Sequence, residues 1–384
     1  MSSTHPIVIP RLFESDSTLN ERLSILHDRI LAAIPVVDRI AVAIYDAAED
    51  KLKTFVNSTR KGEAITSYDF KLSDSPSLHK LAMSGEPRVI NEIQEIIRAS
   101  SLHSNWLLKQ GYRSSYTLPI YDNGEFIGFV FFDSMEQAAF TQEVQRDLSL
   151  YCSLINMSIS SEFAAVRSIV ASAKVARDFA HLRDFETGSH LERMARYSRL
   201  IAKSIAPAYT LSDEFVEHVL LFAPLHDVGK IGIPDNVLLK PGKLDAAERK
   251  IMQSHVVKGV EIVKKILGDF ALQHLPDSKI MLNMVKYHHE FLDGSGYPHG
   301  LKGDQIPIEA KIVTVADIFD ALTGKRPYKP VWSTNEAFDE LNRMVAAGKL
   351  DADCVAAIER NAEEIDSIRE RYQDTGTFGP HFRP

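Results

Sequence analysis

The hydrophobic pattern of this chain changes its period once, and that change constrains the fold more than any other feature. Up to about residue 134, several short runs alternate apolar and polar residues. From about residue 138, apolar residues recur every three or four positions almost to the C-terminus. Alternation is typical of half-buried strands, whereas steps of three and four are typical of helices. We therefore expect a mixed α and β part followed by a helical part, whose helices include residues 211–230, 278–290 and 308–323.

Length, charge and cysteine content narrow the class of protein. The chain has 384 residues and a net charge of −8, so we expect two domains and no binding to a nucleic acid polymer, which needs a basic face. Its two cysteines, Cys152 and Cys354, stand in no metal-binding spacing and are expected to be buried in a reducing compartment. The sequence has no apolar run of about eighteen residues and no signal peptide, so we expect a cytoplasmic protein without a membrane segment.

The N-terminal part reads as a sheet flanked by helices. We expect a helix over residues 20–35, two strands over 39–58, helical pieces within 75–110 and a hairpin over 112–134. The hairpin turns at Asp122-Asn123-Gly124, a strong signal for a tight β-turn. This order of elements resembles a GAF domain over roughly residues 15–150. The resemblance implies a sensory domain that binds a small molecule or dimerises, although no cyclic-nucleotide signature and no chromophore-holding cysteine is found.

A long helix is expected to connect the two parts, with residues 151–184 as the connector. Apolar residues follow one another at steps of three and four, without proline or glycine, at Leu148, Cys152, Ile155, Ile159, Phe163, Val166, Ile169 or Val170, Ala173 and Ala176. A seam with spacing near 3.5 favours pairing with a second copy of the chain, which would make a homodimer. The alternative is that the seam packs on the chain's own domains.

The helical part is rich in nitrogen and carboxylate ligands but has no cysteine among them. The candidates are Glu186, His190, His226, Asp227, His255, His288, His289 and Asp317. Such a mixture suits iron, manganese or zinc in a catalytic site better than a closed structural zinc site. Each histidine alone is more often a surface or core residue than a ligand. An His-Asp pair inside the apolar run VLLFAPLHD, however, would bury a charge without a partner unless a cation were bound.

The spacing of these ligands predicts more than one ion. Glu186 and His190 are four residues apart, so both lie on one helix face. His226 and Asp227 are adjacent, which on a regular helix directs them about 100° apart, and the same holds for His288-His289. Adjacent residues therefore fit a site in which neighbours reach different ions. Asp227, with two carboxylate oxygens, is the expected bridge between two of them.

The stretch HHEFLDGSGYPHGLKGDQIP at 288–307 gives the most specific resemblance. The His-Asp pair, the paired histidines and the later aspartate resemble the HD superfamily of metal-dependent phosphohydrolases. This stretch is similar to the signature of the HD-GYP family, with Gly296-Tyr297-Pro298 as its naming triplet, and HDVGKIGIPDNVLLKPGKL, VADIFDALT and RPYK match other blocks of that family. The resemblance implies an all-α helical bundle over residues 185–384. The whole chain is then multidomain: an α+β GAF-like domain, a long helix and an all-α bundle.

The resemblance also implies an activity and a set of roles. HD-GYP domains are bacterial phosphodiesterases that open cyclic di-GMP, giving linear pGpG and in some cases GMP. All eight candidate ligands match the family's positions, with Glu186 associated with a third metal, so two or three divalent ions, iron or manganese, are expected. Asp227 and Lys230 would be catalytic. Lys230, Tyr297, Arg326 and Lys329 would contact the substrate, whereas Asp293 and His299 are expected only to make loop hydrogen bonds.

Three other functions stay open at this point. The substrate could be a mixed cyclic dinucleotide such as cyclic GMP-AMP. The domain could be another HD-type hydrolase that acts on a nucleoside triphosphate or an alarmone, although the GYP loop and RPYK count against this. Finally, the protein could be a cyclic di-GMP receptor without turnover, which the complete ligand set disfavours.

Overall fold

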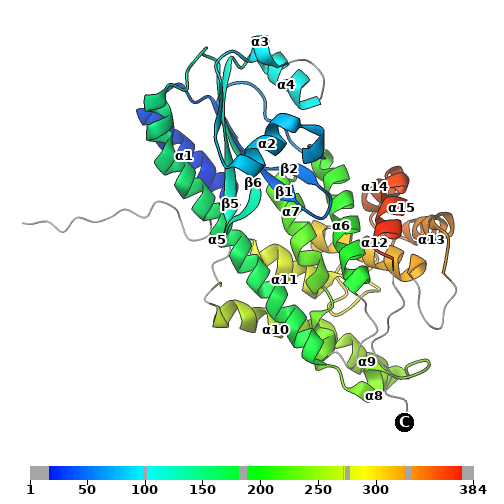
Figure 1. The fold of residues 1–384 in the computed structure, drawn as a ribbon. Coiled ribbons are helices and arrows are strands. Elements are labelled where there is room, and N and C mark those ends of the chain that lie inside the picture. The colour runs from blue at the N-terminus through cyan, green and yellow to red at the C-terminus, as the bar shows by residue number, and fades with distance from the viewer. Residues whose placement is uncertain are drawn as a thin grey trace, which may run out of the picture. The chain divides into compact units, whose positions relative to one another are not determined.

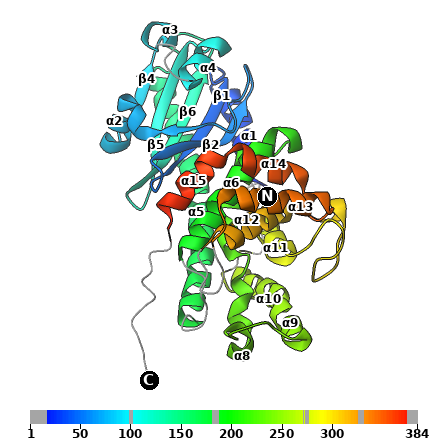
Figure 2. The same ribbon diagram turned by 90° about the vertical axis from the view of Figure 1, so that its right-hand side faces the viewer.

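The computed structural model describes residues 17–97, 102–180, 188–270, 272, 277–324 and 331–373, with the side chains of 173–180 left aside. The chain divides into two compact units, the first ending at Phe163 and the second beginning at Ala164. Figures 1 and 2 show a sheet with helices in the first unit and helices alone in the second. This agrees with the predicted change of period along the sequence.

A six-stranded antiparallel sheet forms the centre of the first unit. Its spatial order is β3-β2-β1-β6-β5-β4. The strands are β1 (Arg39–Asp46), β2 (Lys51–Thr59), β3 (Asp69–Lys71), β4 (Arg88–Ile90), β5 (Ser114–Asp122) and β6 (Glu125–Ser134). Asn123 and Gly124 form the two-residue turn between β5 and β6, both with positive φ (50° and 85°). Asn-Gly favours such a turn because both residues tolerate the left-handed region, so the predicted hairpin is confirmed.

Helices cover both faces of this sheet. The short helices α2 (Pro76–Ser84), α3 (Ile93–Ile96) and α4 (Leu102–Gln110) pack on one face, with the 3₁₀ turn η1 (Leu72–Asp74) beside them. The other face packs against α1 (Leu19–Ala33) and the first half of α5 (Gln142–Ala180). The Thr18 hydroxyl caps α1 by accepting a hydrogen bond from the Glu21 amide.

The helix α5 settles part of the question about the predicted seam. Leu148, Cys152, Ile155 and Ile159 are buried in the core beneath the sheet. In this half of the helix the apolar seam therefore packs on the chain's own domain and not on a second copy of the chain. Leu150 and Met157 on the same helix are exposed, by 65% and 61%. Cys152 and Cys354 are both buried free thiols, as expected.

The described residues of the second unit form helices and no named strand. The helices are α6 (Gly188–Tyr209), α7 (Asp213–Phe222), α8 (Asp235–Leu238), α9 (Ala246–Gln253), α10 (His255–Asp269), α11 (Ser278–Tyr287), α12 (Ile308–Thr323), α13 (Thr334–Ala346), α14 (Ala352–Arg360) and α15 (Ala362–Arg371). The 3₁₀ turns are η2 (Ala223–Leu225), η3 (Val228–Gly232) and η4 (Gly303–Gln305). Among the described helices of the chain, none is both long and apolar enough to cross a bilayer.

Two predicted helices are shorter than the sequence suggested. The segment 211–230 begins as expected, because the Ser212 hydroxyl accepts a hydrogen bond from Phe215, but α7 ends at Phe222. Pro224 follows within η2, where its missing amide hydrogen and its ring prevent an α-helix from continuing. The segment 278–290 stops at Tyr287. Both ends bring the predicted ligands onto turns instead of regular helices.

Candidate metal centre

The His-Asp pair lies on a turn that is packed closely against α10. His226 follows η2 and Asp227 precedes η3, and both side chains are buried. Gly229, two residues later, touches the start of α10. A Cβ placed on it would stand 1.8 Å from the backbone oxygen of His255. The glycine therefore allows His255, the first residue of α10, to lie beside Asp227, with 3.0 Å between His255 Nε2 and Asp227 Oδ1.

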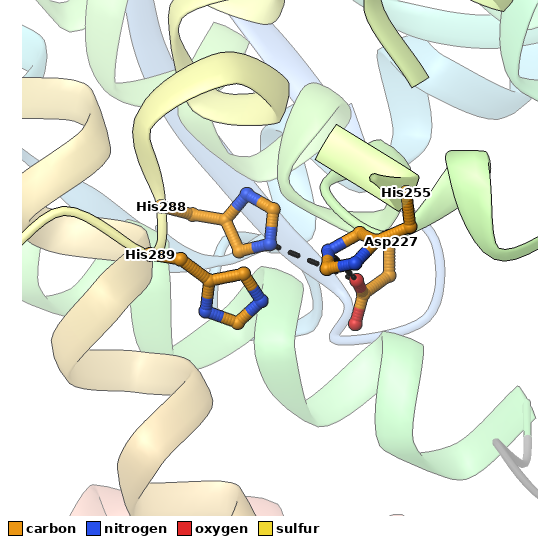
Figure 3. A group of neighbouring side chains, drawn as sticks. All are labelled: Asp227, His255, His288 and His289. Carbon is orange, nitrogen blue, oxygen red and sulfur yellow. Dashed lines mark ion pairs between the residues drawn. The ribbon is translucent and has the colours of Figure 1, made fainter. Parts of the chain in front are cut away.

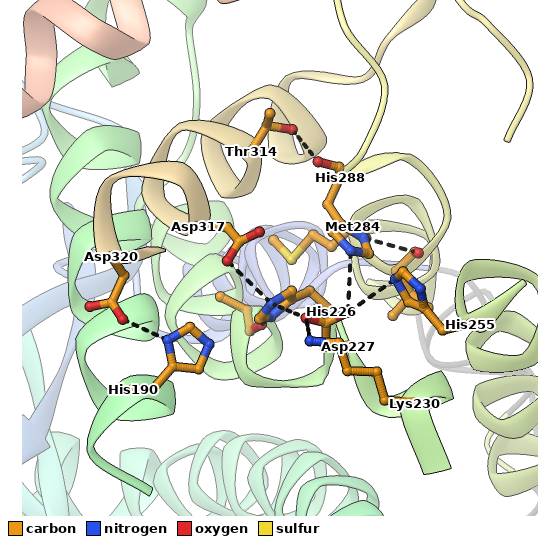
Figure 4. Close-up of polar contacts among 12 residues, drawn as sticks. His190, His226, Asp227, Lys230, His255, Met284, His288, Thr314, Asp317 and Asp320 are labelled. Atoms are coloured by element: carbon orange, nitrogen blue, oxygen red, sulfur yellow. Dashed lines mark hydrogen bonds and ion pairs between the residues drawn. The ribbon is translucent and has the colours of Figure 1, made fainter. Parts of the chain in front are cut away.

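Seven of the eight predicted ligands lie in the described part of the chain, and they gather into two adjacent groups. One group contains His190, His226 and Asp317, and the other contains Asp227, His255, His288 and His289. Within each group the potential ligand atoms all lie within 4.8 Å of one another. The two groups meet at the His-Asp pair, because His226 Nε2 lies 3.2 Å from Asp227 Oδ2 and 4.0 Å from Asp317 Oδ1 (Figure 4).

The paired histidines do not divide between the groups as the sequence argument supposed. His288 and His289 belong to the same group, and their ring centroids are 4.1 Å apart (Figure 3). The angle of about 100° between neighbours holds only on a regular helix. Because α11 ends at Tyr287, the chain is free to turn both imidazoles toward Asp227. The other adjacent pair, His226 and Asp227, does divide between the two groups.

Hydrogen bonds fix the tautomer of three imidazoles in the centre. The Nδ1 atoms lie at hydrogen-bonding distance from backbone carbonyls three or four residues earlier: His226 from Ala223 (2.8 Å), His255 from Met252 (2.7 Å) and His288 from Met284 (3.0 Å). A carbonyl oxygen only accepts, so each Nδ1 carries the proton. The lone pair is then on Nε2, the atom that faces the carboxylates of the centre.

The charge state of this group suits cation binding. Burial opposes ionisation of the Asp227 carboxyl, but Lys230 and His226 outweigh burial and hold its pKa well below the usual range. Burial lowers the pKa of His288, and burial together with His288 lowers the pKa of His289 well below its usual value. Asp227 is therefore an anion and both histidines are neutral near pH 7, which are the forms that bind metal.

The loop after the paired histidines folds back over them. Gly296 touches the backbone of His289 and Glu290, where an added Cβ would stand 2.5 Å from the His289 oxygen. This close approach brings the ring of Tyr297 to 4.6 Å from that of His289, between centroids. The Asp293 carboxylate accepts a hydrogen bond from the Ser295 amide, which confirms its role within the loop.

Glu290 is a residue that the sequence argument missed. Its side chain is buried, and its two carboxylate oxygens accept hydrogen bonds from the amides of His299 (2.7 Å) and Leu301 (3.0 Å). Glu290 thus ties the start of the loop to its end. The sequence signal for Glu290 was its position, because it is an acidic residue directly after two candidate ligands and before a glycine-rich loop.

Asp320 and its partner Arg193 were also missed. Asp320 Oδ2 lies 2.7 Å from Nδ1 of His190, and Arg193 donates two hydrogen bonds to the same carboxylate (Figure 4 shows the His190 contact). Burial opposes ionisation of Asp320, but His190 and Arg193 lower its pKa. Asp320 follows Asp317 by three residues on α12, and a second carboxylate on one face of an apolar helix was the signal that it needed a partner.

Three predicted site residues fall outside the described residues. They are Glu186, Arg326 and Lys329. Close to the last two in sequence, Gly324 and Val331 line an open pocket of about 520 Å³. Arg193 contributes to the same pocket. Its volume lies within the range of small-molecule sites, about 300–1,000 Å³.

The residues of both groups fit divalent metal ions. Asp227 Oδ1, His255 Nε2 and His288 Nε2 are buried and make no hydrogen bond within the described part of the chain. Buried polar atoms are normally satisfied, and a cation among them would do so. Imidazole nitrogens combined with carboxylates, without thiolate, suit iron, manganese or zinc. The residues that would hold the ions are the seven of the two groups.

Comparisons with known proteins find relatives that are phosphodiesterases of cyclic dinucleotides. The chain is 42% identical over 187 residues to the cyclic di-GMP phosphodiesterase response regulator RpfG of Xanthomonas campestris, covering 48% of this chain and 46% of that protein. It is 40% identical over 196 residues to a cyclic di-GMP phosphodiesterase of Thermotoga maritima, covering 51% and 50%. It is 37% identical over 216 residues to 3'3'-cGAMP-specific phosphodiesterase 2 of Vibrio cholerae, covering 54% and 39%.

The chain thus spans half or less of the length of these relatives. Family models match it in two places, residues 18–159 as a GAF domain and residues 177–354 as an HD domain. The first match covers the sheet and its helices, and the second covers both ligand groups. The chain therefore carries a GAF-like domain followed by a helical region that matches an HD domain.

Proposed function

We propose that the HD domain hydrolyses a cyclic dinucleotide, cyclic di-GMP, to linear pGpG, with GMP as the product of a second cut. The observation that carries this proposal is the pair of ligand groups that meet at His226 and Asp227. Bound divalent ions would supply charge neutralisation at the phosphate and would activate water near neutral pH. Two of the curated relatives are cyclic di-GMP phosphodiesterases, which supports this choice of substrate.

Lys230 is suited to act on the phosphate beside the ions. Its ammonium lies 2.7 Å from Asp227 Oδ2, yet 22% of its side chain is exposed. It therefore connects the buried carboxylate with the region that substrate can reach. We assign Lys230 the role of stabilising negative charge on the scissile phosphate or protonating the departing oxygen.

Arg326 and Lys329 complete the proposed substrate contacts. They belong to the segment 325–330, whose neighbours in sequence, Gly324 and Val331, line the pocket of about 520 Å³. A pocket of this size accommodates part of a cyclic dinucleotide. We assign Arg326 and Lys329 the role of binding the phosphate that is not cleaved. Tyr297, which lies over His289, would contact the substrate from the other loop.

A mixed cyclic dinucleotide is the second candidate substrate. The resemblance to 3'3'-cGAMP-specific phosphodiesterase 2 of Vibrio cholerae favours it. The chemistry at phosphorus is the same for both substrates, so the ligand groups do not distinguish them. Discrimination would come from contacts to the bases.

We assign the GAF domain a regulatory role. The helix α5 begins in the GAF core and continues into the second unit, so it connects the two domains directly. We infer that a small molecule bound to the GAF domain controls hydrolysis, and that the protein is a cytoplasmic homodimer in which the exposed Leu150 and Met157 face the partner. Melting of the GAF domain against a panel of small molecules and ultracentrifugation of the whole chain test these two inferences.

The activity is tested on full-length protein purified without oxygen. Metal content is measured first, and the protein is then incubated with cyclic di-GMP, the mixed cyclic dinucleotide and a nucleoside triphosphate. Chromatography of the products is expected to show pGpG from cyclic di-GMP. Metal-loaded protein that leaves both cyclic dinucleotides intact would overturn the proposal, and tight binding of cyclic di-GMP without product would identify a receptor.

A further inference from the structure

The hydrogen bond that orients His190 differs from those that orient His226, His255 and His288. The Nδ1 atoms of these three histidines lie at hydrogen-bonding distance from a backbone carbonyl three or four residues earlier in the chain. His190 instead contacts the side chain of Asp320, which is 130 residues later in the sequence. The difference has a local cause. His190 is the third residue of α6, so no preceding turn of that helix offers it a carbonyl.

Asp320 is itself held from the other side. Arg193 is one turn after His190 on α6, and it donates from Nε to Asp320 Oδ1 (2.6 Å) and from Nη2 to Asp320 Oδ2 (3.0 Å). The remaining arm of the guanidinium, Nη1, donates to the backbone oxygen of Tyr372 (2.8 Å). A fork of this kind leaves the carboxylate little freedom to rotate.

The three side chains form a closed arrangement. His190, Arg193 and Asp320 are all buried, with exposed fractions of 6%, 5% and 3%. A buried carboxylate that accepts the Nδ1 proton directs the lone pair of Nε2 and increases the basicity of the ring. In the described structure His190 belongs with His226 and Asp317 to one ligand group.

From this geometry we infer that Asp320 and Arg193 are positioning residues that orient His190 and so set the metal affinity of the His190, His226 and Asp317 group. The inference rests on the metal centre of the proposed function. Because His190, unlike His226, His255 and His288, is oriented by a side chain distant in sequence, this group is sensitive to changes that leave the Asp227 group intact.

The chain provides a matched control on the same helix. Arg199 on α6 forms a buried ion pair with Glu217 on α7, at 2.6 Å, and neither residue belongs to either ligand group. Replacing Glu217 by Gln removes a buried arginine–carboxylate pair, as replacing Asp320 by Asn does. A loss of stability common to both variants is then the cost of breaking an ion pair, and a loss of metal confined to Asp320→Asn is the effect of positioning.

The test measures metal binding and not hydrolysis. Full-length wild type, Asp320→Asn, Arg193→Lys and Glu217→Gln are stripped of metal, melted, and titrated with Mn²⁺ against a chelator. We expect Asp320→Asn to weaken one class of sites by about ten- to hundred-fold. Arg193→Lys, which keeps the charge but loses the fork, should weaken the same class less. Glu217→Gln should bind as the wild type does, even where its melting temperature falls.

Each result has a definite meaning. Wild type that binds no metal would refute the proposed metal centre itself. Wild-type affinity at every site in Asp320→Asn, or an equal loss in Glu217→Gln, would overturn the positioning role while leaving the proposed function untouched. Should Asp320→Asn fail to fold, Arg193→Lys decides the question, and unchanged Mn²⁺ affinity in that variant would refute the inference.

Discussion

Gly229 and His255 are in backbone contact, and this contact sets how near α10 lies to the His-Asp turn. An added Cβ at position 229 would stand 1.8 Å from the His255 oxygen and 2.4 Å from the Gly259 nitrogen. Neither atom belongs to a flexible side chain, so α10 would have to move. His255 would then leave its place beside Asp227.

Gly229→Ala tests this relationship. Overpacking against backbone costs about 1–3 kcal/mol of stability, and we expect hydrolysis to fall at least about ten-fold as His255 is displaced. Thermal melting and metal titration measure the two effects. Gly188→Ala serves as a control because an added Cβ there meets no atom of the described residues within 4 Å. Normal metal affinity in Gly229→Ala would show that the contact does not position His255.

Asp227→Ala should affect both ligand groups. The carboxylate lies 3.2 Å from His226 Nε2 in one group and 3.0 Å from His255 Nε2 in the other. Its loss removes the negative charge between the two positions, so we expect more than one metal equivalent and all hydrolysis to disappear. Elemental analysis together with product chromatography checks this. Full metal content with normal turnover would exclude Asp227 as a bridge.

Glu186→Ala should affect the ion count by about one. Glu186 lies four residues before His190 in the sequence, and the family resemblance associates it with a third ion. The alternative is an ion pair with Arg183 or Arg193. We expect one equivalent fewer by elemental analysis, with the remaining ions in place. An unchanged count would favour a site for two ions.

Arg326→Ala should separate substrate binding from metal binding. A charged hydrogen bond to phosphate contributes about 1.5–3 kcal/mol, which corresponds to roughly ten- to hundred-fold in affinity. Calorimetry with cyclic di-GMP should show this loss while the metal content stays at the wild-type value. Arg326→Lys should restore little, because a lysine cannot make a bidentate contact. A lost ion in either variant would mean that Arg326 acts on the metal centre instead.

His103 predicts an acid sensitivity of the GAF domain. Its ring stacks between Tyr68 and Trp106, and burial, followed by the charge of Arg39, lowers its pKa to about 4. The unfolded chain takes up a proton at this position below its ordinary pKa of about 6.5, whereas the folded domain does not. The contribution of His103 to stability is therefore complete above about pH 6.5 and is lost as the pH falls toward 4, by no more than about 3 kcal/mol.

The matched variant for this prediction is His103→Gln. Between pH 7.5 and 5.0 the melting temperature of the GAF domain should fall less in His103→Gln than in the wild type. His79→Gln, at an exposed position of α2, should behave as the wild type does. Equal acid sensitivity in the wild type and His103→Gln would contradict the assignment.

Local signals in the sequence were sufficient for much of this structure. The turn at Asn123-Gly124 needs positive φ at both residues, and α12 occupies the predicted range 308–323, because each depends on residues close in sequence. What the sequence could not supply was contacts across long separations. The Arg193–Asp320 pair joins residues 127 positions apart, and the sequence around either residue does not identify its partner. The placement of His288 and His289 in one group likewise depends on where α11 ends.

The hydrogen bond from Arg193 to the Tyr372 oxygen has a consequence for how this protein can be divided into transferable modules. The HD family match ends at residue 354, whereas α15 ends at Arg371 and Tyr372 follows it. A recombinant fragment cut at the family boundary would keep all seven described candidate ligands but would lose the backbone oxygen that accepts a hydrogen bond from Arg193 Nη1. Chimeras that graft this domain onto other sensors should therefore extend at least through Tyr372.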